Sequence, residues 1–182
     1  MSTDRSLELR VFALTGICLL SVQQAERAIA RAVELVLKDR IERANRLIEQ
    51  TEKQQKRILS HFLKELRNRA HIEPDFDQKL WHFVKMRNTL VHNLSEVPGW
   101  NPRTKKGREA AFKFLVELAM LSFALTGVFT SLLLVSAKDE FGVDMIEEDD
   151  DPVRQSLARL IEKQFGPTAH MILAAKKLLS ST

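Results

Sequence analysis

Arg87, Asn88 and His92 lie close together in the chain and are residue types with phosphate and proton chemistry. The imidazole of a histidine titrates near neutral pH, so it can give or take a proton there. A guanidinium stabilises negative charge on phosphate oxygens. These residue types therefore point to acid–base chemistry on a phosphate group.

The spacing of these residues is informative only in a strict form. An arginine followed four to six residues later by a histidine is expected about once by chance in a chain of this composition. The stricter pattern Arg-Asn-x-x-x-His is expected in about one of a hundred shuffled sequences. The chain contains this stricter form, which makes coincidence the weaker explanation.

The helix that carries these residues is predicted to start at Asp75 and to continue to about Leu94. Asp75 followed by Gln78 is a capping-box pattern. At 100° per residue Arg87 falls inside the apolar arc of this helix, while Asn88 and His92 project together from its flank with Trp81 and Lys85. Because an arginine is costly to bury alone, Arg87 needs a partner or a wet cleft. We therefore expect a polar site set into an apolar contact surface, such as the seam of a dimer.

The segment from Asp77 to Asn93, DQKLWHFVKMRNTLVHN, resembles the signature helix of the HEPN superfamily. Those all-α domains occur in prokaryotic toxins, in anti-phage abortive-infection proteins and in RNA-guided CRISPR effectors. The expected order of long helices agrees with that family over most of the chain. The resemblance implies a metal-independent endoribonuclease, without a cofactor, whose Arg-x4-6-His motifs meet across the interface of a homodimer.

The resemblance also implies roles for the matching residues. His92 would act as general base on a ribose 2′-hydroxyl or as acid to the leaving 5′-oxygen, and Arg87 would stabilise the charge on the phosphorane. Asn88 would orient His92 or a phosphate oxygen. Because such a reaction needs the 2′-hydroxyl, the substrate would be RNA. We expect a toxin or a defence effector, with a protein antitoxin or regulator as a further partner.

One departure from the family limits how the protein could be neutralised. In one toxin–antitoxin branch a tyrosine just after the histidine is modified by a nucleotidyltransferase antitoxin. Here Asn93 and Leu94 occupy that region, and the chain contains no tyrosine. This sequence therefore excludes that route.

The rest of the chain predicts an all-α fold, because long runs of helix-forming residues leave few glycines and prolines for turns. We expect a single HEPN-like domain over residues 1–182, a bundle of about four long helices. Two of them run from Asp4 to about Asp39 and from about Ile41 to His71, and a long one runs from about Glu109 to Asp139. An acidic loop follows over residues 139–151. A C-terminal extension over residues 152–182 then forms two short helices separated by Gly166-Pro167.

Leu118 to Ala137 contains no charged residue and is long enough to cross a bilayer. Its serines and threonines and the soluble character of the remaining chain favour a buried central helix and no membrane association. Cys18 is the only cysteine and lies in an apolar run, which favours a buried, unreactive thiol. With no secretory signal at its start, the chain is expected in the reducing cytoplasm.

The net charge of +4 hides an uneven distribution, since acidic residues gather near residues 139–151 and leave the remainder strongly basic. A polyanionic partner such as RNA suits that remainder. Candidate RNA contacts lie on the motif helix and in the following loop: Lys85, Arg103, Lys105, Lys106 and Arg108. The histidines lack partners at ligand spacing, so no metal site is expected. Two alternatives stay open: a catalytically silent HEPN adaptor or regulator, and a basic helical module that binds nucleic acid without cleaving it.

Overall fold

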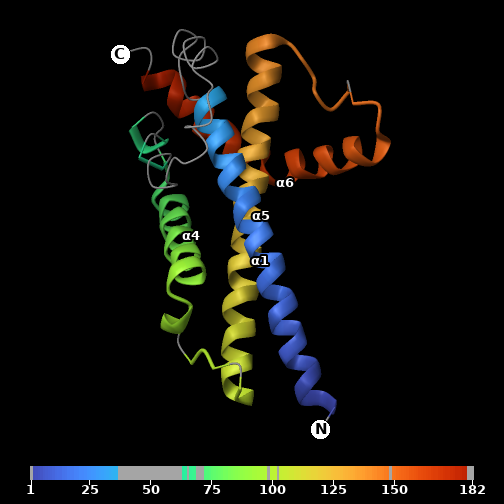
Figure 1. Cartoon of the computed structure of the whole chain (residues 1–182). Coiled ribbons are helices and arrows are strands. Elements are labelled where there is room, and N and C mark those ends of the chain that lie inside the picture. The colour runs from blue at the N-terminus through green and yellow to red at the C-terminus, as the bar shows by residue number, and fades with distance from the viewer. Residues whose placement is uncertain are drawn as a thin grey trace, which may run out of the picture.

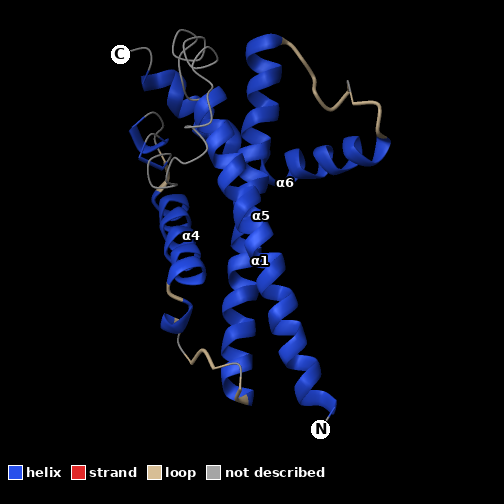
Figure 2. Ribbon diagram, in the orientation of Figure 1, coloured by secondary structure: helices blue, strands red, loops and turns tan. Residues whose placement is uncertain are grey.

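The chain folds into helices throughout the part that the structure describes, which confirms the predicted all-α class. The structure is a computed structural model, and it describes residues 2–36, 63–64, 66–68, 72–97, 99–101, 103–147 and 149–179. Figure 2 shows helices and loops, with no strand among these residues. Most of the helix predicted from Ile41 to His71 lies outside the described residues.

Two long helices, α1 (Ser2–Leu35) and α5 (Lys105–Phe141), form the spine of the molecule and run in the same direction (Figure 1). Each presents a stripe of fully buried apolar side chains to the core, and burial of each such side chain contributes about 1.5–3 kcal/mol. Cys18 of α1 is fully buried, and its Sγ donates to the carbonyl oxygen of Leu115 at 2.9 Å. The predicted buried thiol is therefore confirmed.

The helix α4 (Pro74–His92) lies beside this pair and runs against the direction of α5 (Figure 1). It buries Leu80, Phe83, Met86 and Leu90, and the short 3-10 helix η2 (Leu94–Glu96) follows it. The predicted capping box is wrong, since Glu73 is the N-cap and makes no side-chain cap hydrogen bond. Pro74 is the first residue of the helix instead. Proline suits this position because a backbone N–H there would have no partner within the helix. Asp75 lies within the first turn.

The helix α5 begins four residues before the predicted start, at Lys105. Thr104 is its N-cap, and the threonine hydroxyl accepts from the Gly107 backbone N–H at 3.1 Å. This cap satisfies one of the free N–H groups at the helix start and allows a charged segment to continue the helix. The basic segment expected as a loop is therefore largely the first turn of α5.

The C-terminal extension forms one continuous helix, α6 (Pro152–Leu179), and the predicted break at Gly166-Pro167 is wrong. A proline inside a helix costs about 3 kcal/mol. Here Ala169, Ile172 and Leu173 are buried in the core beyond the proline. A Cβ at Gly127 of α5 would overlap the Phe165 ring, so this glycine lets α6 approach closely. Tertiary packing thus offsets the local preference for a break.

The long apolar helix α5 is the one candidate membrane span among the described residues, by length and composition alone. Its most apolar window has a mean hydropathy of 2.2, and 50% of that window is buried against the other helices. Its hydroxyls are satisfied locally: Ser122 donates to the Leu118 carbonyl at 2.7 Å, and Thr126 donates to the Ser122 carbonyl at 2.9 Å. Half of this apolar window is therefore packed against other helices, and the hydroxyls of Ser122 and Thr126 bond within α5.

Candidate functional site

The Arg87 side chain is held by a carboxylate from another helix. Its Nε donates to Oε1 of Glu26 on α1 at 2.7 Å. The Arg87 side chain is 24% exposed and that of Glu26 is 26% exposed, so the pair lies at the edge of the core. The arginine in the apolar arc therefore has the partner that its burial requires.

The same guanidinium also brings Asn88 and His92 together. Its Nη1 donates to Oδ1 of Asn88 at 3.1 Å and lies 3.4 Å from Nε2 of His92. Because a guanidinium only donates, this contact needs the His92 tautomer with its proton on Nδ1 and a lone pair on Nε2. The Arg87, Asn88, His92 and Glu26 side chains form a connected group that we call the Arg87 cluster.

The geometry of the Arg87 cluster leaves part of the guanidinium available. Nε is bonded to Glu26, and Nη1 faces Asn88 and His92. Within the described part of the chain, the two N–H groups of Nη2 make no hydrogen bond. A guanidinium held at Nε and Nη1 keeps the two N–H groups of Nη2, which can bind a phosphate oxygen with little loss of rotamer freedom.

No family model, curated protein or solved structure matches the chain. The likeness of residues 77–93 to the HEPN signature helix therefore remains a prediction. In the structure Arg87 contacts Asn88 and His92, the residues that the sequence indicated. It also contacts Glu26, which the sequence did not indicate.

Exposed apolar side chains lie on both helices that carry the Arg87 cluster. Val91 of α4 is 43% exposed, and Phe12 and Leu19 of α1 are 57% and 38% exposed. Phe12, Leu19 and Glu26 follow each other at intervals of seven residues, which keeps them on one face of α1 with only a small drift. The face of α1 that carries Glu26 is thus apolar toward the start of the helix, at Leu19 and Phe12.

The candidate RNA contacts lie on α4 and at the start of α5. Lys85 is exposed on α4, and its ammonium lies 5.5 Å from the centroid of the Trp81 ring. Arg103, Lys105 and Lys106 are exposed at the start of α5. Arg108 is only 4% exposed, so its guanidinium does not lie on the surface where RNA would contact it. The reason is that Arg108 sits in the first turns of a packed helix, whereas the sequence suggested a loop.

Other polar groups of α4 form ion pairs that stay outside the Arg87 cluster. His82 Nε2 lies 2.9 Å from Oε1 of Glu117 on α5, and both side chains are about half exposed. Arg67 Nε donates to Oδ1 of Asp77 at 2.7 Å. These pairs fix α4 against its neighbours at the surface, where such pairs contribute about 0–1 kcal/mol each.

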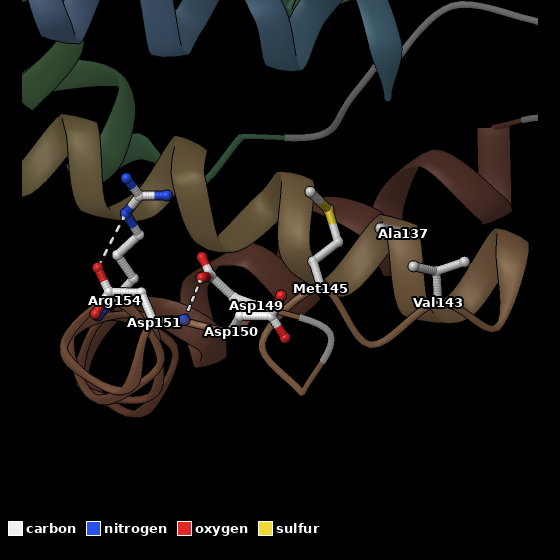
Figure 3. A pocket seen from close by; sticks show the side chains of 7 residues that line it. All are labelled: Ala137, Val143, Met145, Asp149, Asp150, Asp151 and Arg154. Carbon is white, nitrogen blue, oxygen red and sulfur yellow. Dashed lines mark hydrogen bonds and ion pairs between the residues drawn. The ribbon is translucent and has the colours of Figure 1, made fainter.

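A hollow lies where the loop after α5 leads into α6 (Figure 3). Its volume is about 830 Å³, and its lining comes from the end of α5, the following loop and the start of α6. Three aspartates line it, but two of these carboxylates already accept backbone hydrogen bonds. Asp149 accepts from the Asp151 N–H, and Asp151 accepts from the Val153 N–H at the start of α6, each at 2.9 Å. The hollow lacks residues of the Arg87 cluster, so we assign the chemistry elsewhere.

The acidic loop begins at Gly142, because α5 continues to Phe141. The Asp144 carboxylate accepts from Lys138 at 2.8 Å and from the Ile146 N–H at 3.1 Å. The hydrogen bond from Lys138 lowers the pKa of the Asp144 carboxyl below its usual value. Several acidic residues of this loop thus have local structural roles. Among the described residues, no group of three or more His, Cys, Asp or Glu side chains is placed to hold a metal ion.

Glu26 is the residue of the Arg87 cluster that sequence reasoning missed. It lies 61 residues before Arg87 in the chain, so no local pattern connects the two. The available signal was a carboxylate within an apolar helical segment, next to the buried Ala25, Ala28 and Ile29. Such a carboxylate needs a cation, and Arg87 was the residue already identified as needing an anion.

Proposed function

We propose that this protein is a metal-independent endoribonuclease of the HEPN type that acts as a homodimer, serving as a toxin or an anti-phage effector. The observation that carries the proposal is the convergence of Asn88 and His92 on the Arg87 guanidinium, which Glu26 holds in place. The cluster is exposed to solvent on its Asn88 and His92 side, where an RNA backbone can reach it.

In the proposed reaction the 2′-oxygen of a ribose attacks the adjacent phosphorus, and the bond from phosphorus to the 5′-oxygen breaks. Nε2 of His92 gives up its 3.4 Å contact with Nη1 of Arg87 and takes the proton of the 2′-hydroxyl. The displacement leaves a 2′,3′-cyclic phosphate. The leaving 5′-oxygen takes up a proton and becomes a 5′-hydroxyl. Arg87 binds a non-bridging oxygen through Nη2 and stabilises the negative charge that develops on the phosphorane.

The chemistry itself supports a dimer. In an in-line displacement the attacking and leaving oxygens lie on opposite sides of phosphorus, so one imidazole reaches only one of them. A second copy supplies a second His92 as the acid. Exposed apolar side chains on the same two helices, Val91 of α4 and Phe12 and Leu19 of α1, would give such a seam its hydrophobic contact. Interaction with an antitoxin or regulator, and a cytoplasmic location without membrane association, remain parts of this proposal.

The test is cleavage of tRNA and total RNA in EDTA by the purified chain. We expect cleavage that leaves 2′,3′-cyclic phosphate ends, and its loss in Arg87→Ala and His92→Ala. His170→Ala is the control, since His170 is an exposed histidine of α6 and belongs neither to the Arg87 cluster nor to α4. Intact RNA in every sample would contradict the proposal in favour of the silent adaptor. Salt-sensitive RNA binding without cleavage would favour the basic binding module.

A further inference from the structure

A line of polar and aromatic side chains follows the outer surface of α4. Gln78, Trp81, Lys85, Asn88 and His92 succeed each other at alternating steps of three and four residues, which places them on one face of the helix. The buried residues of α4, among them Phe83 and Leu90, lie on the other side. The line therefore faces away from α1 and α5 and ends in the Arg87 cluster.

Trp81 is unusual on this surface because its indole is 59% exposed. An indole is a large flat apolar group, and water contact over this area is unfavourable unless a partner covers it. The Lys85 ammonium lies over one face of the ring, 5.5 Å from its centroid, so a base would stack on the other face. An exposed aromatic ring next to a cation suits a base with its phosphate, because the ring stacks on the base and the cation pairs with the phosphate.

An open pocket of about 680 Å³ borders the indole on the side toward the start of α4. Its other lining residues are Asp75, Asp77, Gln78, Lys79 and His82. Asp77 is paired with Arg67, and both Asp75 and Lys79 line the pocket, so charges of both signs border it. The Asp75 carboxylate and the Gln78 amide can accept hydrogen bonds from the edge of a base. A neutral base thus suits the pocket, and the phosphate that follows it suits Lys85.

We propose that this surface is a binding site for a nucleobase of a single strand, stacked on Trp81 with its phosphate on Lys85. Trp81 and Asn88 are about 10 Å apart along the helix axis, at 1.5 Å per residue. A strand that lies along α4 thus brings a nearby phosphate to the Arg87 cluster. The inference deepens the proposed function, since it names the residues that position the substrate. Trp81 and Lys85 act as positioning residues in this scheme.

The experiment uses single-stranded oligodeoxycytidylate, which has bases and phosphates but no 2′-hydroxyl and is therefore not cut. An abasic deoxyribose-phosphate oligomer of equal length is the matched probe, because it keeps the charges and lacks the bases. Trp100→Phe leaves Trp81 as the sole tryptophan of the two in the chain. We expect oligodeoxycytidylate to quench Trp81 fluorescence, and the abasic oligomer to leave it unchanged.

In binding assays we expect Trp81→Ala to weaken oligodeoxycytidylate about tenfold, which is the usual effect of removing one stacked base contact, and Trp81→Phe to retain most of the affinity. Lys85→Ala should weaken both oligomers and reduce the salt dependence. Equal affinity of the two oligomers, or unchanged binding by Trp81→Ala with native helicity, would overturn the inference. Quenching without any RNA cleavage would support this site and contradict the ribonuclease, whereas cleavage that is indifferent to Trp81→Ala would do the reverse.

Discussion

Nε of Arg87 donates to Oε1 of Glu26 at 2.7 Å, across 61 residues of sequence. This contact fixes the guanidinium between α1 and α4 and turns its Nη1 toward Asn88 and His92. Glu26 therefore has two roles in the proposed site. It compensates the charge of a partly buried arginine, and it sets the direction in which that arginine offers its remaining donors.

We expect Glu26→Ala to lower the free energy of unfolding by about 1–2 kcal/mol, because it leaves a partly buried guanidinium without its anion. Arg87→Ala should have a similar effect, and the double variant should show a coupling energy of about 1 kcal/mol in denaturant unfolding. Glu26→Gln, which retains a hydrogen-bond acceptor, serves as the milder comparison. Additive single effects would show that the contact adds no stability.

The same cycle separates structural from functional effects. If RNA is cleaved, Glu26→Gln should lower kcat more than it raises KM, because Arg87 would be held less firmly in the transition state. A loss of activity that follows only the loss of folded protein would mean that Glu26 is structural alone.

The exposed apolar side chains of Phe12 and Leu19 on α1 should decide the oligomeric state. We expect Phe12→Asp combined with Leu19→Asp to give a monomer by sedimentation velocity and to abolish cleavage. Met120→Asp is the control, because Met120 is 65% exposed and lies on α5 and not on α1. It lies one helical turn before Phe123, whose ring contacts Phe165 of α6. A protein that remains dimeric with both α1 residues changed would place the interface elsewhere.

Two glycines should respond oppositely to alanine. In Gly107→Ala the new Cβ would overlap the backbone oxygen of Asn101, so we expect a loss of about 1–3 kcal/mol from overpacking. Gly16 has no atom within 4 Å of such a Cβ, so Gly16→Ala should gain about 0.5–1 kcal/mol from helix propensity. Thermal unfolding of both variants is the measurement. A stabilised Gly107→Ala would mean that the loop before α5 can move aside.

The Cys18 thiol should stay unreactive in the folded protein. Burial raises its pKa from the ordinary 9.0 to about 11, although the Ala119 backbone hydrogen bond acts in the opposite direction. We therefore expect a thiol reagent at pH 8 to label Cys18 only as the α1 and α5 pair opens, at the rate of that opening. Rapid labelling of the native protein would contradict this.

The same shift makes a pH prediction with a definite sign. The folded state holds the thiol proton more tightly than the unfolded state. The contribution of Cys18 to the free energy of unfolding is therefore complete below pH 9 and is lost as the pH rises through about 11. Cys18→Ser removes this titration but places a hydroxyl in the core. The free energy of unfolding of this variant should therefore change less between pH 9 and pH 11 than that of the parent protein.

Sequence alone determined the helical class, the placement of Arg87, Asn88 and His92 on one helix, and the burial of Cys18. These features follow from local composition and from apolar periodicity, which a single segment contains. The demand of Arg87 for a partner was likewise visible, since a charge within an apolar arc must be compensated wherever the fold places it.

Only the tertiary structure decided which residue compensates Arg87, because Glu26 comes from a distant helix and many acidic residues could have served. It also decided that α6 continues through Pro167 and that Arg108 is buried, where local signals favoured a break and an exposed loop. In each case contacts between distant segments outweigh a local preference of about 3 kcal/mol or less. A pattern within one helix cannot contain that information, because the balancing contacts belong to another part of the chain.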